Sequence, residues 1–311
     1  MLSCATTPKT PSWDVSPDAF SKTFPNSRYI AQRGTGADKA SAEADAASQI
    51  ARYFSTQVSY QFSEQLQNSQ TNTDIQTIIN SNIQVFGIRY TADPYINNKQ
   101  WVTVAYIDRN EAWQIFQPKV KQYADALVLL ITEASNEKDP FKKALLSIAA
   151  QNYYSSDDYQ NVIVFGQILH HSFMYNEISN TITLLSGLPQ LIDTSKRNAS
   201  IYIDCTDDFE SMITNAFTRE FTIMGFPVSN EKNNTSAICK ITITEGRQER
   251  DMGIFYHPSL QAVITGNTGV LWTFSTQAER ASAVTPDVAK RRAFQNLTEK
   301  IKNSQLLISN F

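Results

Sequence analysis

The chain has 311 residues, 41% hydrophobic and 18% charged, which is typical of a folded protein and excludes a disordered one. This length accommodates two compact domains and a connecting segment. The net charge is only −3 and basic residues are interspersed among acidic ones. A nucleic-acid-binding protein is therefore not expected, because such proteins carry a basic patch or stripe.

The first 25 residues are predicted to form an irregular tether, because prolines occur at positions 8, 11, 17 and 25. Leu2-Ser3-Cys4 has the form of the end of a bacterial lipoprotein signal peptide, which makes Cys4 the candidate for lipidation, for example with palmitate. No basic start or apolar segment precedes Cys4 here, so either upstream residues have been lost or Cys4 is an ordinary cysteine. No stretch approaches the roughly 20 apolar residues of a membrane span, so lipid would be the membrane anchor.

Residues 29–58 read as a strand, a glycine turn and an amphipathic helix. Gly34 and Gly36 are predicted to allow the reversal from strand to helix. A helix whose apolar face begins with alanines can lie close against a sheet. A nucleotide site is disfavoured, because Gly34-Thr35-Gly36 lacks the third glycine of a dinucleotide fingerprint and no Gly-Lys-Ser/Thr follows. No cofactor is expected. The predicted apolar face consists of Ala40, Ala44, Ala47, Ile50, Ala51, Phe54 and Val58.

Two further strands are predicted around residues 83–91 and 100–108, joined as a hairpin through the turn residues 93–99. In the second strand, apolar side chains fall on both faces. We therefore expect a second element to cover the face that carries Val102, Val104 and Tyr106.

This region resembles the LPP-twenty family of bacterial outer-membrane lipoproteins. The resemblance rests on Tyr29-Ile30, on the two glycines, on the alanine-rich helix and on the extended segment from Trp101 to Ile107. It covers about a third of the chain. The resemblance implies a periplasm-facing, non-enzymatic module, related in fold to domains of flagellar-ring and assembly proteins such as FlgT, and it supplies no active-site residue.

Residues 110–195 carry helical periodicity and are predicted to form a helical insert between two domains. Pro118 is a predicted kink, and Asp139-Pro140 has the cap-then-proline order of a helix start. A third helix is predicted from about Asp157, with Gly187 and Pro189 as its stop signals.

Residues 196–311 are predicted to form a second α/β domain. A strand at 201–205 leads into a helix capped near Asp207 and Asp208, with Gly225 as the turn that ends it. Gly266-Asn267-Thr268-Gly269 is a hairpin signal, and Thr285-Pro286 begins a final helix. This order resembles the anticodon-binding-like fold of the TolB N-terminal domain, CsgG and the LpoB activator, on the helix followed by Gly225-Phe226 and on Gly269-Val270-Leu271-Trp272.

Residues that could carry chemistry are few. His170 and His171 project about 100° apart on a helix and cannot jointly bind a metal, so surface histidines are expected and no metal site is predicted. Asp207, Asp208 and Glu210 are interpreted as helix-capping acids in preference to catalytic ones. The basic run at residues 290–292 is interpreted as a solvated helix face in preference to a site for an acidic lipid or polymer.

Cys205 and Cys239 fall on the apolar faces of strands expected to share one sheet. In an oxidising periplasm they would close a disulfide. Two buried free thiols are the equally weighted alternative.

Together these patterns predict an α+β protein of two small domains, in each of which helices pack on a mainly antiparallel sheet, joined by the helical insert. The domain boundaries are 1–25, 26–109, 110–195 and 196–311. The predicted function is a non-catalytic lipoprotein at the bacterial outer membrane that faces the periplasm, a scaffold or assembly factor with protein partners in the envelope and an oligomer as an option. The alternatives are a binding module that activates a cell-wall or secretion enzyme and, third, an enzyme. No catalytic residue is proposed.

Overall fold

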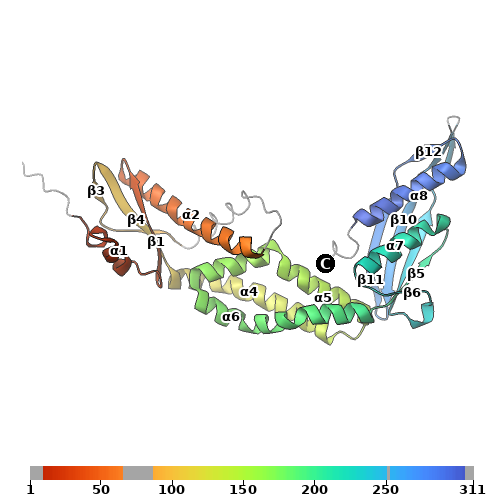
Figure 1. The fold of residues 1–311 in the computed structure, drawn as a ribbon, viewed down its shortest axis with the longest axis horizontal. Coiled ribbons are helices and arrows are strands. Elements are labelled where there is room, and N and C mark those ends of the chain that lie inside the picture. Colours follow the sequence, from red (N-terminus) through yellow and green to blue (C-terminus); the bar gives the residue numbers. More distant parts are fainter. Residues whose placement is uncertain (1–9, 66–86, 251–252, 305–311) are drawn as a thin grey trace, which may run out of the picture. The chain divides into compact units, whose positions relative to one another are not determined.

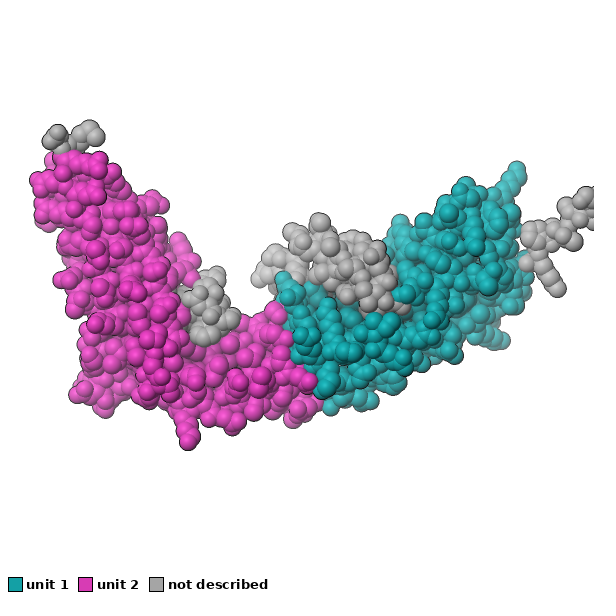
Figure 2. All heavy atoms as spheres, turned by 180° about the vertical axis from the view of Figure 1, so that it is seen from behind, with its two compact units in different colours: residues 1–124, 157–179 teal, residues 125–156, 180–311 magenta. Residues whose placement is uncertain are grey.

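The computed structural model describes residues 10–65, 87–250 and 253–304, and the chain forms two compact units (Figures 1 and 2). Unit 1 comprises residues 1–124 and 157–179, and unit 2 comprises residues 125–156 and 180–311. The helices α4 (Arg109–Asn136) and α6 (Asp157–Asn198) contribute residues to both units. The segment 110–195, predicted as a separate insert, is therefore divided between the units.

The sheet of unit 1 is antiparallel and has the order β1-β4-β2, with β3 also pairing with β4. Its strands are β1 (Tyr29–Gly36), β2 (Arg89–Tyr90), β3 (Tyr95–Asn97) and β4 (Gln100–Asp108). The predicted turn 93–99 was too long, since it contains β3, and the reversal occurs at Asn98 and Lys99, which have φ values of 48° and 65°. Two consecutive residues of positive φ are what a two-residue hairpin requires.

Helix α2 (Lys39–Gln65) covers one face of this sheet (Figure 1). The prediction of a close helix is confirmed, but its N-terminal register was wrong: Ala44 is exposed, and the buried row runs along i, i+4 positions. Gly34 and Gly36 do not form the predicted turn, because both lie inside β1 and neither has a positive φ. The fully buried row consists of Ala42, Ala46, Ile50, Phe54 and Val58.

The opposite face of the sheet is covered by the 3-10 helix η1 (Ser12–Asp14) and helix α1 (Pro17–Thr23). Trp13 and Phe24 are buried there against Val102 and Val104. This confirms that a second element covers this face. The prediction of an irregular tether up to residue 25 was wrong for residues 12–23, because Ser16 caps α1 and Pro17 occupies its first turn.

The first parts of α4 and α6 complete the core of unit 1. α4 runs through Pro118, and α6 is interrupted at His170, whose φ of −157° and ψ of 84° are not helical. Arg109 donates from Nη1 to the carbonyl oxygens of Ile168 and Leu169, the latter at 2.9 Å. The carbonyls that lose helical partners at the break are thereby satisfied. The buried residues of these helices include Trp113, Phe116, Val120, Val162, Phe165 and Leu169.

The larger sheet of unit 2 has the order β11-β10-β7-β5-β6. Only the pairs β5–β7 and β5–β6 are parallel, and the other two are antiparallel. A smaller antiparallel sheet has the order β12-β9-β8. The larger sheet consists of β5 (Ile201–Cys205), β6 (Val228–Ser229), β7 (Ala237–Thr244), β10 (Ser259–Gly266) and β11 (Gly269–Gln277), and the smaller of β8 (Gln248–Arg250), β9 (Gly253–Tyr256) and β12 (Ala281–Ala283).

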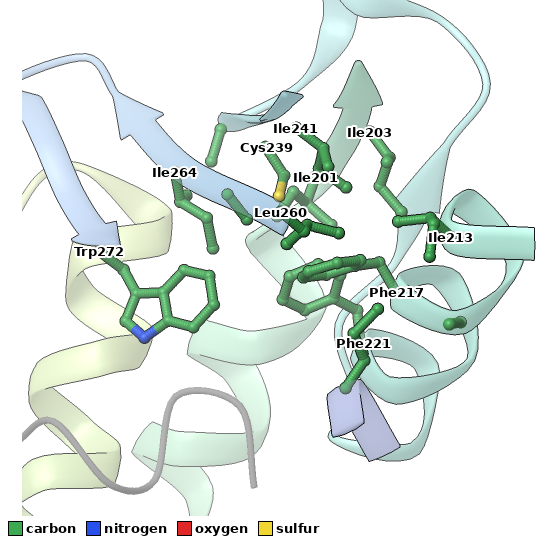
Figure 3. Packing of buried hydrophobic residues seen from close by; sticks show 14 of the residues in the cluster. Ile201, Ile203, Ile213, Phe217, Phe221, Cys239, Ile241, Leu260, Ile264 and Trp272 are labelled. Atoms are coloured by element: carbon green, nitrogen blue, oxygen red, sulfur yellow. The ribbon is translucent and has the colours of Figure 1, made fainter. Parts of the chain in front are cut away.

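Helices α7 (Met212–Ile223) and α8 (Pro286–Asn303) lie side by side on one face of the larger sheet (Figure 1). Strand residues such as Ile201, Cys239 and Ile264 point toward Phe217 and Phe221 of α7 (Figure 3). Helix α5 (Pro140–Ser155) extends this core, with Phe141 and Phe226 ring centroids 5.2 Å apart. The short 3-10 helices η2 (Phe209–Ser211) and η3 (Lys232–Asn234) lie in connections.

The predicted end of α7 and the predicted start of α8 are confirmed, and the predicted end of α6 is not. Gly225 has a φ of 87° and ends α7, with the Phe226 N–H donating to the Phe221 carbonyl at 2.9 Å, as in a Schellman motif. Gly187 and Pro189, predicted as stop signals, lie inside α6. With helices packed on mostly antiparallel sheets, the predicted α+β fold class is confirmed.

Candidate interaction sites in unit 2

The loop between α4 and α5, residues 137–139, borders two recesses of unit 2, with volumes of about 790 and 510 Å³. Glu137 and Lys138 line both. The larger is completed by Thr132, Glu133, Asn136, Asp139, Lys142, Leu146, Asn267 and Thr268, and the smaller by Pro140, Lys143, Gly187, Gln190, Leu191, Thr194, Ser195 and Asn198.

The two carboxylates of this loop are bonded within the protein. Asp139 is buried, and its Oδ1 accepts from the Lys142 N–H at 3.0 Å while its Oδ2 accepts from the Asn267 N–H at 2.8 Å. Glu137 Oε1 accepts from the N–H groups of Lys138 and Asp139, and its Oε2 lies 2.7 Å from Lys142 Nζ. Asp139 therefore ties the start of α5 to the β10–β11 turn.

These bonds stabilise the charged forms of Glu137 and Lys142. The hydrogen bond from Lys142, followed by that from the Asp139 N–H, lowers the pKa of Glu137 to about 2. The hydrogen bond to Glu137 raises the pKa of Lys142. A general acid or base works best when its pKa lies near the operating pH. Neither group meets that condition, and the bonds of Glu137 to Lys142 and to the N–H groups of Lys138 and Asp139 hold the loop.

The second candidate is the outer edge of β11, the last strand of the larger sheet. Ala278 N–H donates to the Pro258 carbonyl at 2.8 Å, and the register of β10 and β11 continues from that pair. Because hydrogen-bonded and non-hydrogen-bonded pairs alternate in antiparallel sheets, the backbone groups of Thr273, Ser275 and Gln277 point away from β10. Lys300 Nζ donates to the Gln277 carbonyl, which is consistent with that carbonyl pointing away from β10. No strand of the described chain pairs with that edge.

The side chains of β11 itself are uncharged, and Lys300 of α8 places a charge at the C-terminal end of the edge. No charged residue occurs from Gly269 to Gln277, and Thr273, Ser275 and Gln277 are exposed. A shallow recess of about 420 Å³ adjoins the strand on the face away from α7 and α8, and polar hydroxyl and amide side chains predominate in its lining: Thr242, Thr244, Ser259, Leu260, Gln261, Ser275, Thr276 and Gln277. Natural edge strands are commonly protected by charges, prolines or bulges. The stretch of β11 from Thr273 to Gln277 has no charge and no proline, and the bulge of this strand, at Leu271, lies before it.

The edge strand of unit 1 differs, because its outward N–H groups are engaged at both ends. The Tyr29 N–H donates to the Pro25 carbonyl at 2.8 Å, and the Thr35 N–H donates to Asp45 Oδ2 at 2.9 Å. Arg33 places a charge between them, 2.6 Å from Asp14. The β1 edge is thus engaged at both ends. Among the described residues, the β11 edge is engaged only at its C-terminal end, where Lys300 Nζ donates to the Gln277 carbonyl, and it is open at Thr273 and Ser275.

Cys205 and Cys239 are both free thiols in the structure. Cys205 is opposite Ile241 in the parallel ladder and Cys239 is opposite Ile203, so the cysteines are offset by two residues on neighbouring strands. Strand spacing and rise put their Cα atoms about 8 Å apart, beyond the reach of a disulfide without backbone movement. The register favours the free-thiol alternative. Burial, as the largest cause, raises the pKa of each thiol to about 12.

The other predicted site residues have structural roles where they are described. Gly34 and Gly36 allow the close approach of α2, and Gly225 forms the turn after α7. Asp208 caps α7, its carboxylate accepting from the N–H groups of Ile213 and Thr214. Cys4 lies outside the described residues.

Glu210, interpreted as a helix-capping acid, instead pairs with Arg291. Lys290 pairs with Glu245, and Arg292 donates to the Ser282 carbonyl, so the basic run at residues 290–292 is bonded to neighbouring groups.

His170 is not on a regular helical turn but stacks on Phe173, with ring centroids 3.8 Å apart. Burial, then the nearby charge of Arg109, lowers its pKa. Within the described residues, no three His, Cys, Asp or Glu side chains gather as metal ligands, and no helix is long and apolar enough to span a membrane.

Sequence reasoning identified Asp139-Pro140 as a helix start. It missed the Glu137–Lys142 ion pair, because no sequence motif indicates it. It also placed β11 after a hairpin without recognising it as an edge. An uncharged run of nine residues after a hairpin turn was the available signal.

No family model matches the sequence, and no curated protein matches it. The resemblance to the LPP-twenty family therefore stays a resemblance. Two similar solved structures are the secreted protein HP1454 from Helicobacter pylori, 13% identical with a TM-score of 0.37 over 91% of this chain and 98% of that one, and the lipoprotein GNA1162 from Neisseria meningitidis, 14% identical with a TM-score of 0.25 over 34% of this chain and 99% of that one. At these values neither likeness assigns a function or a location to the chain.

Proposed function

We propose that this protein is a non-catalytic lipoprotein of the bacterial envelope that acts as a scaffold or assembly factor and binds protein partners at the β11 edge. The observation that carries the proposal is the open part of the edge: Thr273 and Ser275 present outward backbone groups, and the side chains of Thr273, Ser275 and Gln277 are exposed and uncharged. Strand addition to such an edge supplies affinity through backbone hydrogen bonds.

The recesses of unit 2 support a binding role over catalysis. The two carboxylates of the loop beside these recesses are already bonded within the protein: Asp139 bonds the Lys142 N–H at the start of α5 and the Asn267 N–H in the β10–β11 turn, and Glu137 pairs with Lys142. Catalytic acids and bases are poised for proton transfer near neutral pH. Glu137 and Lys142 differ, because their pairing stabilises the charged form of each and so disfavours proton transfer near neutral pH.

Site-specific photo-crosslinking in native envelopes tests the docking role. A photo-reactive residue at Ser275 should capture envelope proteins, and the same residue at Thr242 is the matched control. Thr242 is also exposed on the open face of the sheet but belongs to a central strand, opposite Gln261. Failure to capture any envelope protein at Ser275, or equal capture at Thr242, would contradict docking at the edge.

The lipid anchor is tested separately, by intact mass and membrane fractionation of the wild-type chain and of Cys4→Ser. Lipidation should add mass to the wild-type chain and keep it in the membrane fraction, while Cys4→Ser should be released. An unmodified Cys4 in chain recovered from membranes would end the anchor proposal and leave the docking proposal standing.

A further inference from the structure

We infer that the partner of the β11 edge is a second copy of this chain, joined by antiparallel β11–β11 pairing about a two-fold axis at Ser275. This inference rests on the proposed docking role of the edge. It commits to one register, in which Ser275 is opposite Ser275 of the second copy and Thr273 is opposite Gln277 of the second copy.

The first argument is hydrogen bonding. In this register the outward N–H and C=O groups of Thr273, Ser275 and Gln277 meet those of the second copy. About six backbone bonds would form across the seam, if each outward group finds its counterpart. The Gln277 carbonyl, which already accepts from Lys300 Nζ, keeps a second lone pair for the seam.

The second argument is charge. Like charges directly opposite one another destabilise strand pairs. Self-pairing of β11 brings none together, because residues 269–277 carry no charge. Lys300 Nζ, which bonds the Gln277 carbonyl, lies at one end of the seam, and the two-fold axis places Lys300 of the second copy at the other end.

The third argument is apolar area at the edge. Phe274 and Leu271 are only partly buried although they pack against the core of unit 2, and Val270 is 64% exposed. In the stated register Phe274 lies opposite Thr276 of the second copy, on the face that carries α7 and α8. Pairing therefore covers apolar surface that the single chain leaves at the end of its sheet.

The fourth argument is closure. The opposite edge of this sheet is β6, which has only two residues, Val228 and Ser229. Head-to-tail stacking of sheets would have to use that short edge. Pairing of β11 with itself uses the long edge on both chains and closes after two copies, as isologous interfaces do.

Disulfide trapping tests the register, in a Cys4→Ser background. The remaining thiols have pKa values raised to about 12 by burial, so they react slowly. Ser275→Cys should form a covalent dimer, because hydrogen-bonded antiparallel pairs have Cα atoms about 5.5 Å apart, within disulfide range. Thr242→Cys is the control, since two strands on each side would separate its copies by about 24 Å.

A second pair of variants tests the register further. A mixture of Thr273→Cys and Gln277→Cys chains should cross-link, whereas Thr273→Cys alone should not. Cross-linking of Thr273→Cys alone, or none for Ser275→Cys, would overturn the stated pairing.

Ser275→Pro tests the dimer without trapping. Its N–H points away from β10, so proline removes a donor of the seam and no bond of the folded chain, a position where edge strands accept proline. The wild-type chain should show twice the 35.0 kDa mass of one chain in sedimentation or light scattering, and folded Ser275→Pro should show half that value. Phe274→Pro is the control for misfolding, because it removes a hydrogen bond to β10 within the folded chain and should therefore disrupt the sheet itself.

A wild-type chain of single mass with no Ser275→Cys dimer would overturn this inference alone. The photo-crosslinks at Ser275 would then decide the proposed function. Capture of a different envelope protein would preserve it, and capture of nothing would end it.

Discussion

At Gly34 the space for a side chain is occupied by α2. A Cβ built there would lie 2.6 Å from the Ala46 Cβ and closer still to the Ala46 nitrogen and the Ala42 carbonyl oxygen. Gly34→Ala should destabilise unit 1 by about 1–3 kcal/mol, since backbone atoms of a packed helix must move. Urea unfolding followed by amide exchange in β1 and α2 measures it. Gly187→Ala is the control: nothing lies within 4 Å of its Cβ, and alanine in a helix interior should stabilise by about 0.5–1 kcal/mol. Equal stability of Gly34→Ala and wild type would contradict this role.

The same residue shows how far sequence reasoning reaches at this scale. The alanine-rich start of α2 predicted a helix close to the sheet, whereas the two glycines were identified only as the residues of the reversal from strand to helix. They were assigned to a turn because a Gly-x-Gly sequence has the same pattern whether the glycines form a turn or allow another element to pack closely against the strand. Only the packing of Ala42 and Ala46 against β1 distinguishes the two.

The connection between α4 and α5 is held by an ion pair whose contribution depends on pH. The folded chain lowers the Glu137 pKa from 4.5 to about 2, so the unfolded chain binds this proton first as the pH falls. The stabilisation is therefore complete above about pH 5 and is lost as the pH falls toward 2. Glu137→Gln should lower the urea midpoint of unit 2 at neutral pH, and its difference from wild type should shrink as the solution is acidified through this window. A difference that stays constant would show that Glu137 acts by packing alone. Glu133→Gln, in the same recess, is the control.

Elements with strong local signals were predicted well, and those decided by tertiary contacts were not. Local patterns predict the apolar face of α7 and the Gly225 turn after it. They also predict the Gly266–Gly269 hairpin and the start of α8 at Pro286. By contrast, α6 passes Gly187 and Pro189 yet breaks at His170, where Arg109 of another helix supplies the missing hydrogen bonds. The β11 edge likewise depends on strand order, which the pattern of one strand does not contain.

The whole molecule contains separate cores for its two units. Phe54 is buried in a cluster made only of unit 1 residues, and Phe217 in one made only of unit 2 residues. The sequence predicted two domains but treated 110–195 as a third part, because periodicity shows that a helix has an apolar face and not which sheet that face completes. Trp113 and Phe141, both from that segment, show the division, since each joins the core of a different unit.

Separate cores predict separate unfolding. Phe54→Ala and Phe217→Ala should each cost about 3–5 kcal/mol within their own unit, because each leaves a cavity in a packed core. Hydrogen exchange followed by mass spectrometry should then show faster exchange in β1 and β4 for Phe54→Ala and in β7 and β10 for Phe217→Ala, with the other sheet unchanged. Loss of protection in both sheets from either substitution would show a single cooperative unit. Since α4 and α6 contribute residues to both units, protection in their two parts should respond separately, each part following the core in which its apolar side chains are buried.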